Sequence, residues 1–173
     1  MAGMSSQWRP VEEALRAHHV RDVLVPGWID RDGDVPEFRP QPMVVWLRLD
    51  DGFLRFESAG QYDRLASARV PAVSWADIGV LADAEDEVIV ASYGEQLFGD
   101  GRSEWRCTRI RVYPGGGAEC RCLALDFEGG HTLFLDPTWT FGIRLGNEAQ
   151  EKCWVELYGD GACGVETTLV PGG

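Results

Sequence analysis

The chain has 173 residues and a formal net charge of −12, with 45% hydrophobic and 25% charged residues. This composition is typical of a folded soluble protein and excludes disorder over the whole chain. The strong acidity argues against nucleic acid as a partner, because phosphate binding needs clustered Lys and Arg. No apolar run approaches the roughly 20 residues that span a bilayer, and the first residues lack the pattern of a secretory signal. We therefore expect a single domain, residues 1–173, in the cytoplasm, with no membrane partner.

The N-terminal segment predicts one helix over residues 10–24. Pro10 suits the first helical position, and the Glu12-Glu13 pair suits the positive end of the helix dipole. Apolar residues recur at helical spacing, so the helix should pack one stripe against the rest of the protein. Pro26 is expected to end it.

After a proline-rich loop over residues 29–42, the chain changes to short β-branched and aromatic runs separated by turn residues. We expect strands at residues 43–49, 53–58, 64–70, 88–93, 105–113, 119–127, 131–136, 152–158 and 165–170. These runs predict a mainly β (α+β) fold: an antiparallel sheet or a small barrel of about eight or nine strands with one N-terminal helix.

A weak internal duplication is a further hypothesis. The strand and turn at residues 47–50 resemble those at residues 123–126, and a returning strand follows each. Any two β-hairpins can show such a likeness, so chance resemblance is the alternative. A true duplication would give β-rich halves at about residues 43–76 and 105–170, joined by an acidic segment, residues 77–104.

The acidic segment carries the sharpest functional hint. It holds eight acids and one base, which accounts for seven of the twelve excess negative charges. A one-signed surface repels polyanions and steers basic proteins. We therefore predict a non-catalytic protein-binding module, with a bacterial immunity or inhibitor protein that neutralises a basic toxin or enzyme as its concrete form. A solvated loop that only keeps the protein soluble is the alternative. The predicted partner-binding acids are Asp83, Glu85, Asp86, Glu87, Glu95 and Asp100, and the predicted aromatic anchors are Tyr93, Phe98 and Trp105.

A second hypothesis is a β-barrel protein that binds or transforms a small ligand in a tryptophan-lined pocket. His131, Asp126 and Asp136 would be its first acid–base candidates, without a nucleophile beside them. A structural subunit of a larger assembly is a third possibility. The pocket residues would be drawn from Trp46, Trp75, Trp105, Trp139 and Trp154.

The sequence predicts neither a metal ion nor a cofactor. Residues 30–34 begin like a calcium loop, but Val35 and Gln41 stand where such a loop needs Gly and Glu. A zinc site of four thiolates is conceivable, yet no CxxC knuckle is present, and buried spectator thiols are the favoured interpretation. The cysteines are Cys107, Cys120, Cys122, Cys153 and Cys163.

Four arginines crowd one predicted hairpin: Arg106, Arg109, Arg111 and Arg121. A small basic face is one interpretation of this cluster. Because the hairpin directly follows the acidic segment, pairing within the chain with Asp100, Glu104 or Glu119 is the simpler one. Surface pairs of this kind contribute only about 0–1 kcal/mol each.

Overall fold

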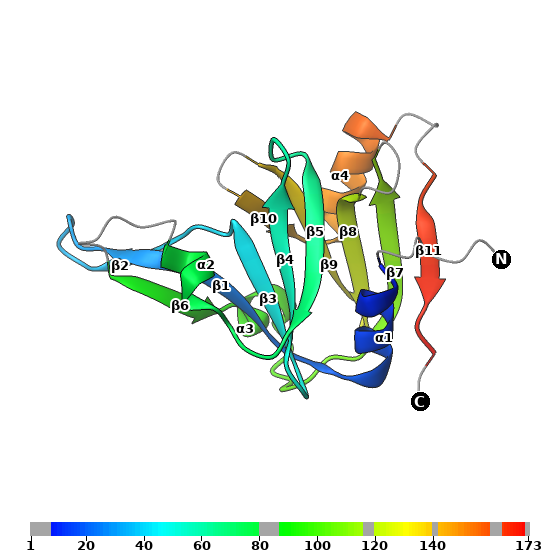
Figure 1. Ribbon diagram of the computed structural model, residues 1–173, viewed down its shortest axis with the longest axis horizontal. Coiled ribbons are helices and arrows are strands. Elements are labelled where there is room, and N and C mark those ends of the chain that lie inside the picture. The colour runs from blue at the N-terminus through cyan, green and yellow to red at the C-terminus, as the bar shows by residue number, and fades with distance from the viewer. Residues whose placement is uncertain (1–7, 80–86, 116–119, 140–141, 160–163, 172–173) are drawn as a thin grey trace.

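The computed structural model of the chain describes residues 8–79, 87–115, 120–139, 142–159 and 164–171. Eleven strands in these ranges form one antiparallel sheet, and four helices lie around it (Figure 1). The helices are α1 (Arg9–Ala17), α2 (Trp75–Gly79), α3 (Gly94–Phe98) and α4 (Glu148–Tyr158). The strands are β1 (Val20–Asp30), β2 (Glu37–Pro40), β3 (Val44–Leu49), β4 (Phe53–Ala59), β5 (Arg64–Val70), β6 (Val88–Ser92), β7 (Cys107–Pro114), β8 (Cys120–Phe127), β9 (His131–Trp139), β10 (Gly142–Gly146) and β11 (Glu166–Leu169).

The sheet is curled but open over the described residues. Its main path runs β10-β9-β8-β5-β4-β3-β1-β2, while β7 pairs with β8 and β11, and β6 pairs with β1. The start of β10 approaches the chain just before β3, where the Ile143 N–H donates to the Pro42 carbonyl oxygen at 2.7 Å. Gly142, at φ +114°, permits this approach, because an added Cβ would lie 2.5 Å from the same oxygen. The predicted mainly β, antiparallel fold is therefore confirmed, as an open sheet with more strands than expected.

The main core fills the space between the inner face of the curled sheet and α1. Leu47, Leu54, Ile110 and Leu125 point into it from four strands and are fully buried. Side chains alternate along a strand, so other residues of these strands face outward. Two smaller clusters form on that outer face, one under α4 and one beside α2. The first contains Tyr113, Cys122, Ala124, Phe134 and Trp154, and the second contains Val44, Trp46 and Ile78.

The N-terminal helix is shorter than predicted. The sequence indicated a helix over residues 10–24, but α1 ends at Ala17 and His18 already has an extended backbone (φ −132°, ψ 151°). Val20 then begins β1 and exchanges two backbone hydrogen bonds with Trp105. β-Branched valines favour extended backbone, and pairing in the sheet outweighs the helical pattern here.

The last predicted hairpin is wrong in its first strand. Residues 152–158 belong to α4, which begins with a capping box: the side chain of Asn147 accepts from the Ala149 N–H, and the side chain of Gln150 accepts from the Asn147 N–H. The predicted strand at residues 165–170 does form β11, but its partner is β7. Strands β2 and β10 lie in segments where no strand was expected.

Both segments of the internal likeness form antiparallel hairpins, β3–β4 and β8–β9. Hairpins with short turns recur throughout antiparallel sheets, so their presence does not distinguish duplication from chance. The duplication, and the division of the chain into two β-rich halves, stay predictions.

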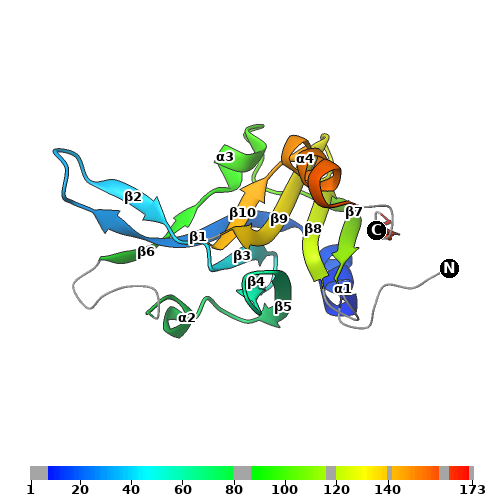
Figure 2. The ribbon, with the colours of Figure 1, turned by 90° about the horizontal axis from the view of Figure 1, so that it is seen from above.

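A three-stranded arm projects from one end of the sheet (Figure 1). In it, β1 pairs with β6 on one side and with β2 on the other. Gly27 is required in this arm, because an added Cβ would clash with the Arg39 carbonyl group and the Phe38 ring. Figure 2 shows α2 and α3 on opposite sides of the sheet near the base of the arm. We define the arm as Leu24–Asp30 of β1, strands β2 and β6, and the connecting loop 31–36.

Candidate functional site

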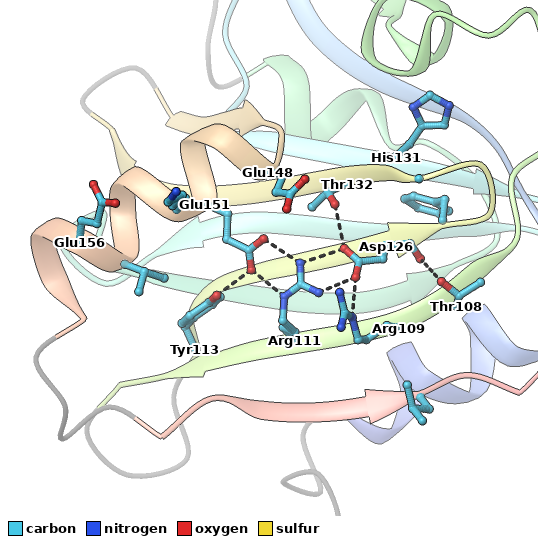
Figure 3. A pocket seen from close by; sticks show the side chains of 15 residues that line it. Thr108, Arg109, Arg111, Tyr113, Asp126, His131, Thr132, Glu148, Glu151 and Glu156 are labelled. Carbon is cyan, nitrogen blue, oxygen red and sulfur yellow. Dashed lines mark hydrogen bonds and ion pairs between the residues drawn. The ribbon is translucent and has the colours of Figure 1, made fainter.

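A cleft of about 890 Å³ opens between α4 and the outer face of β7, β8 and β9 (Figure 3). Its floor is polar, with side chains from three strands and from the helix, and Phe127, Val155 and Leu169 contribute apolar surface to its walls. A volume of this size lies within the range of small-molecule pockets, roughly 300–1,000 Å³. The cleft is therefore large enough to hold a small molecule.

Arg111 occupies the centre of the cleft floor. Its guanidinium donates two hydrogen bonds to Asp126 of β8, at 2.5 and 2.8 Å, and two to Glu151 of α4, both at 2.7 Å. Bidentate pairs of this geometry are the strong form of an arginine–carboxylate contact. One side chain of β7 thus ties the helix to the neighbouring strand.

Further donors complete this network. The Tyr113 hydroxyl donates to Glu151 at 2.6 Å, while the Thr132 hydroxyl and Arg109 Nε donate to Asp126 at 2.8 and 2.6 Å. Asp126 therefore accepts four hydrogen bonds and Glu151 three. Two arginines face two carboxylates, so the cluster is neutral as a whole. We call these residues, together with Arg111, the cleft network.

The pKa values of the cleft network follow from these contacts. Burial alone would lower the pKa of Arg111, but its hydrogen bonds to Glu151 and Asp126 raise it above the usual value. Burial alone would raise the pKa of Asp126, and the donors around its carboxylate outweigh burial and lower it. Burial and the hydrogen bond to Glu151 both raise the pKa of Tyr113. Arg111, Asp126 and Tyr113 thus each keep one protonation state at neutral pH.

The contacts of the cleft network are better suited to holding α4 against the sheet than to proton transfer. A general base needs a free lone pair within reach of the substrate, and the Asp126 oxygens are already occupied by donors. Glu151 is only 6% exposed and, with Trp154, is one of two buried residues of α4. The cleft network therefore holds α4 on the sheet.

His131 lies at one end of the cleft, and its Nε2 is 2.9 Å from the Asp100 carboxylate. Of the acid–base candidates from the sequence, His131 and Asp126 line the same cleft. Asp136 lies instead in a smaller groove of about 190 Å³ on the other side of α4. There its carboxylate accepts hydrogen bonds from the backbone and hydroxyl of Thr138. The three candidates do not meet at one site.

The five tryptophans that were predicted to line one pocket lie in several different parts of the structure. Trp46 and Trp105 are buried in two different clusters, and Trp75 is 63% exposed on α2. Trp139 and Trp154 line the smaller groove together. The described residues thus do not bring these five side chains together in one pocket.

The described cysteines are free, and three of them are buried in the sheet. Burial raises the pKa of the Cys107 thiol to about 12, and it raises those of Cys120 and Cys122 as well. Such thiols are poor nucleophiles at neutral pH. Cys153 is exposed on α4, and Cys163 lies outside the described residues.

The predicted aromatic anchors are mostly interior. Phe98 and Trp105 are each 4% exposed, and their rings lie 4.4 Å apart in the main core. Tyr93 is half-buried, with its ring edge-on to Phe38. Phe98, at the end of α3, and Trp105, just before β7, are both part of the main core. Neither side chain is therefore available as a surface anchor.

The predicted steering acids fall into two groups. Asp83, Glu85 and Asp86 lie outside the described residues. Glu87, by contrast, pairs with Arg31 of the arm at 2.5 Å. Glu95 and Asp100 lie on or just after α3, where Glu95 is exposed and Asp100 accepts from Trp105 Nε1 at 3.2 Å.

Arginines neutralise much of the described acidic segment. Asp77 pairs with Arg55 at 3.0 Å, Asp100 with Arg102 at 3.3 Å, and Glu104 with Arg21. The part of the segment that the structure describes is therefore not a uniform negative surface. Within the described residues, it gathers further negative charge where it meets acids from another part of the chain.

That meeting point is the free end of the arm. The pairing of β1 with both β2 and β6 brings Glu87 beside the acidic turn between β1 and β2, and the Ile29 N–H donates to the Glu87 carbonyl oxygen at 3.0 Å. The sequence alone does not bring these segments together, because fifty residues lie between them. We call the five carboxylates gathered here the acidic tip: Asp30, Asp32, Asp34, Glu37 and Glu87.

Two arginines, Arg31 and Arg39, accompany the acidic tip. Five acids against two bases leave an excess of three negative charges. In the described part of the chain, no helix has both the length and the apolarity that crossing a membrane requires. The chain matches no family model, no curated protein and no solved structure.

Proposed function

We propose that this chain is a non-catalytic protein-binding module that presents its acidic tip to a basic protein. The observation that carries the proposal is the placement of Glu87 beside the acidic turn at the free end of the arm. Clustered carboxylates on a projecting element accelerate association with a basic partner and make it salt-dependent.

A bacterial immunity or inhibitor protein that blocks a basic toxin or enzyme is the concrete form of this proposal. Blockade requires a complementary surface and no chemistry. The cleft network supports this form, because its charged groups are used to hold α4. The free thiols fit a reducing compartment such as the cytoplasm.

The test compares two variants of equal charge. Each converts four carboxylates to amides, so each has the same net charge. The tip variant carries Asp32→Asn, Asp34→Asn, Glu37→Gln and Glu87→Gln, and the control variant carries Glu13→Gln, Asp51→Asn, Glu128→Gln and Glu156→Gln.

The native protein should capture a basic protein from its host at low salt and release it at high salt. With that protein purified, we expect the tip variant to lower the association rate at least about tenfold and the control variant to lower it far less. An equal fall in both variants would show that net charge, and not the tip, drives association. Capture of no basic protein would count against the proposal.

The size of the cleft supports a second candidate function, the binding of a small molecule. Native mass spectrometry of the gently purified protein tests it directly. A bound molecule should disappear in Val155→Trp, which fills the cleft, and persist in Leu157→Trp, on the other side of α4. Such a result would favour this function over the first.

A further inference from the structure

The arm carries a continuous apolar surface on one of its two faces. Trp28 lies directly opposite Val88, and Leu24 lies opposite Trp46 of β3. Residues directly opposite in an antiparallel pair share a face, and so do residues two apart along a strand. Leu24, Trp28, Val88 and Val90 therefore line the same side of the sheet as the buried cluster beside α2. We call these four residues the arm face.

The arm face borders that cluster. Trp46 and Ile78 are fully buried, and Leu24, Val88 and Val90 pack against the cluster while being only partly buried themselves. Trp28 is likewise only partly buried, farther along the arm. Single exposed apolar residues are ordinary on protein surfaces, but a contiguous set beside a core cluster is typical of a binding surface.

Charge around the arm face indicates what covers it. Asp30 follows Trp28 on the same face, and Glu37 lies directly opposite Asp30. Arg39 bridges these two carboxylates at 3.1 and 2.9 Å, which leaves one uncompensated negative charge in this group. The rest of the acidic tip adds to that excess. An apolar centre with an acidic rim complements a partner with an apolar side chain between basic ones.

A second copy of the chain fits this surface poorly. Each copy carries a net charge of −12, and two acidic tips would face each other across a symmetric interface. Like-charge repulsion of this kind keeps proteins apart. The occupant that suits the surface is a different, basic protein.

Resting on the proposed function, we infer that the arm face is the centre of the partner interface, and that the partner is a basic protein that inserts an apolar side chain flanked by Lys or Arg. In this interface the acidic tip steers the encounter, and Trp28 supplies the anchor. Large aromatic side chains carry much of the binding energy at such centres.

Two synthetic peptides test this inference with defined probes. One has two leucines flanked on each side by lysines, and the matched peptide has glycines in place of the leucines. Binding is measured by calorimetry, and the site is located by backbone amide shifts in nuclear magnetic resonance. We expect the leucine peptide to bind at least about tenfold more tightly and to shift amides of β1 and β6.

Variants connect this preference to the arm face. Trp28→Ala should remove most of the tenfold preference, and Val88→Thr, which keeps a β-branched side chain in the strand, should reduce it about threefold. Leu157→Ala removes an apolar residue that is 69% exposed on α4, and it should change nothing. Circular dichroism confirms that each variant is folded.

The outcomes separate this inference from the proposed function. If both peptides bind equally and salt weakens both, the acidic tip attracts basic chains and the inference about the arm face fails. If neither binds, both fail. If the chain forms a dimer that the Trp28→Ala substitution dissociates, the arm face binds a second copy of the chain. That result would overturn the inference that its partner is a basic protein.

Discussion

The cleft and the acidic tip both place carboxylates beside arginines, but they use them in opposite ways. In the cleft, Asp126 and Glu151 are saturated with hydrogen bonds and largely withdrawn from water. At the tip, Asp32 and Asp34 are exposed, and neither has an ion pair among the described residues. The charges of the cleft network thus hold α4, whereas those of Asp32 and Asp34 at the tip are available to attract a partner.

The comparison also explains which arginines matter for stability. A buried charge that loses its partner keeps the full cost of desolvation. An exposed ion pair gains little when it forms, because water and salt screen it. The same contact between Arg and Asp therefore has different consequences at the two sites.

The largest effect is expected from Arg111→Met. This change leaves Asp126 and Glu151 without their shared cation, and removing one partner of a buried pair costs about 3–5 kcal/mol. We expect the free energy of unfolding, measured by urea denaturation, to fall by about that amount. Arg39→Met, the equivalent change on the arm, should cost about 0–1 kcal/mol. If both variants lost the same free energy of unfolding, the ion pairs of the cleft would contribute no more to stability than those of the acidic tip.

Glu151→Gln should have a smaller and more local effect. The amide keeps the shape of the side chain but loses the charge-assisted contacts with Arg111, so we expect a loss of about 1–3 kcal/mol. Hydrogen exchange should quicken in α4 more than in β3 or β4, because Glu151 and Trp154 are the buried residues of that helix. Uniform acceleration over the whole chain would show that the cleft network stabilises the fold globally.

Local sequence pattern predicts much of the sheet. The alternating run at residues 53–58 and the run at residues 64–70, which ends just before Pro71, correspond closely to β4 and β5. Such strands have one buried face, and turn residues separate them, so their sequence alone carries the information. The error at α4 has a physical cause: Trp, Val and Tyr have high strand propensity, and the capping residues Asn147 and Gln150 were the available signal for a helix.

The sites were harder to predict because they depend on pairing across long stretches of chain. Arg111 stood out in the sequence, but its partner Glu151 lies forty residues away on a helix that was predicted as strand. Glu87 and the acidic turn likewise meet only through the shared pairing of β1. Composition indicated the kind of charge present, and the topology determined where it gathers.

Asp50 combines features of the two sites, because its carboxylate is exposed as at the tip but hydrogen-bonded as in the cleft. The pH dependence of its contribution to stability therefore tests the comparison. It is accessible, yet its carboxylate accepts from the His19 backbone N–H at 2.8 Å and from Arg21 Nε at 2.6 Å. The His19 backbone bond is the main cause that lowers the pKa of Asp50 to about 2, against a usual 3.8. Its stabilising contribution is therefore complete above about pH 4 and is lost as the pH falls towards 2.

In a thermal unfolding series, Asp50→Asn should be less stable than the native protein at pH 6, and the gap should close below pH 4. Asp51→Asn changes the neighbouring residue, whose side chain is 84% exposed, and should keep the native pH dependence. A gap that persists unchanged at pH 2 would show that the contacts of Asp50 do not require its charge.

The smallest effect on stability is expected at the acidic tip. Asp32→Asn with Asp34→Asn removes exposed charge that no described contact uses, so the free energy of unfolding should change by less than about 0.5 kcal/mol. The change could even be positive at low salt, because the chain carries −12 overall and like charges destabilise a compact state. Asp126→Asn, measured beside it, should cost far more. If the tip variant instead lost more than about 1 kcal/mol, its carboxylates would be structural like those of the cleft, and an acidic tip kept for a partner would have no support.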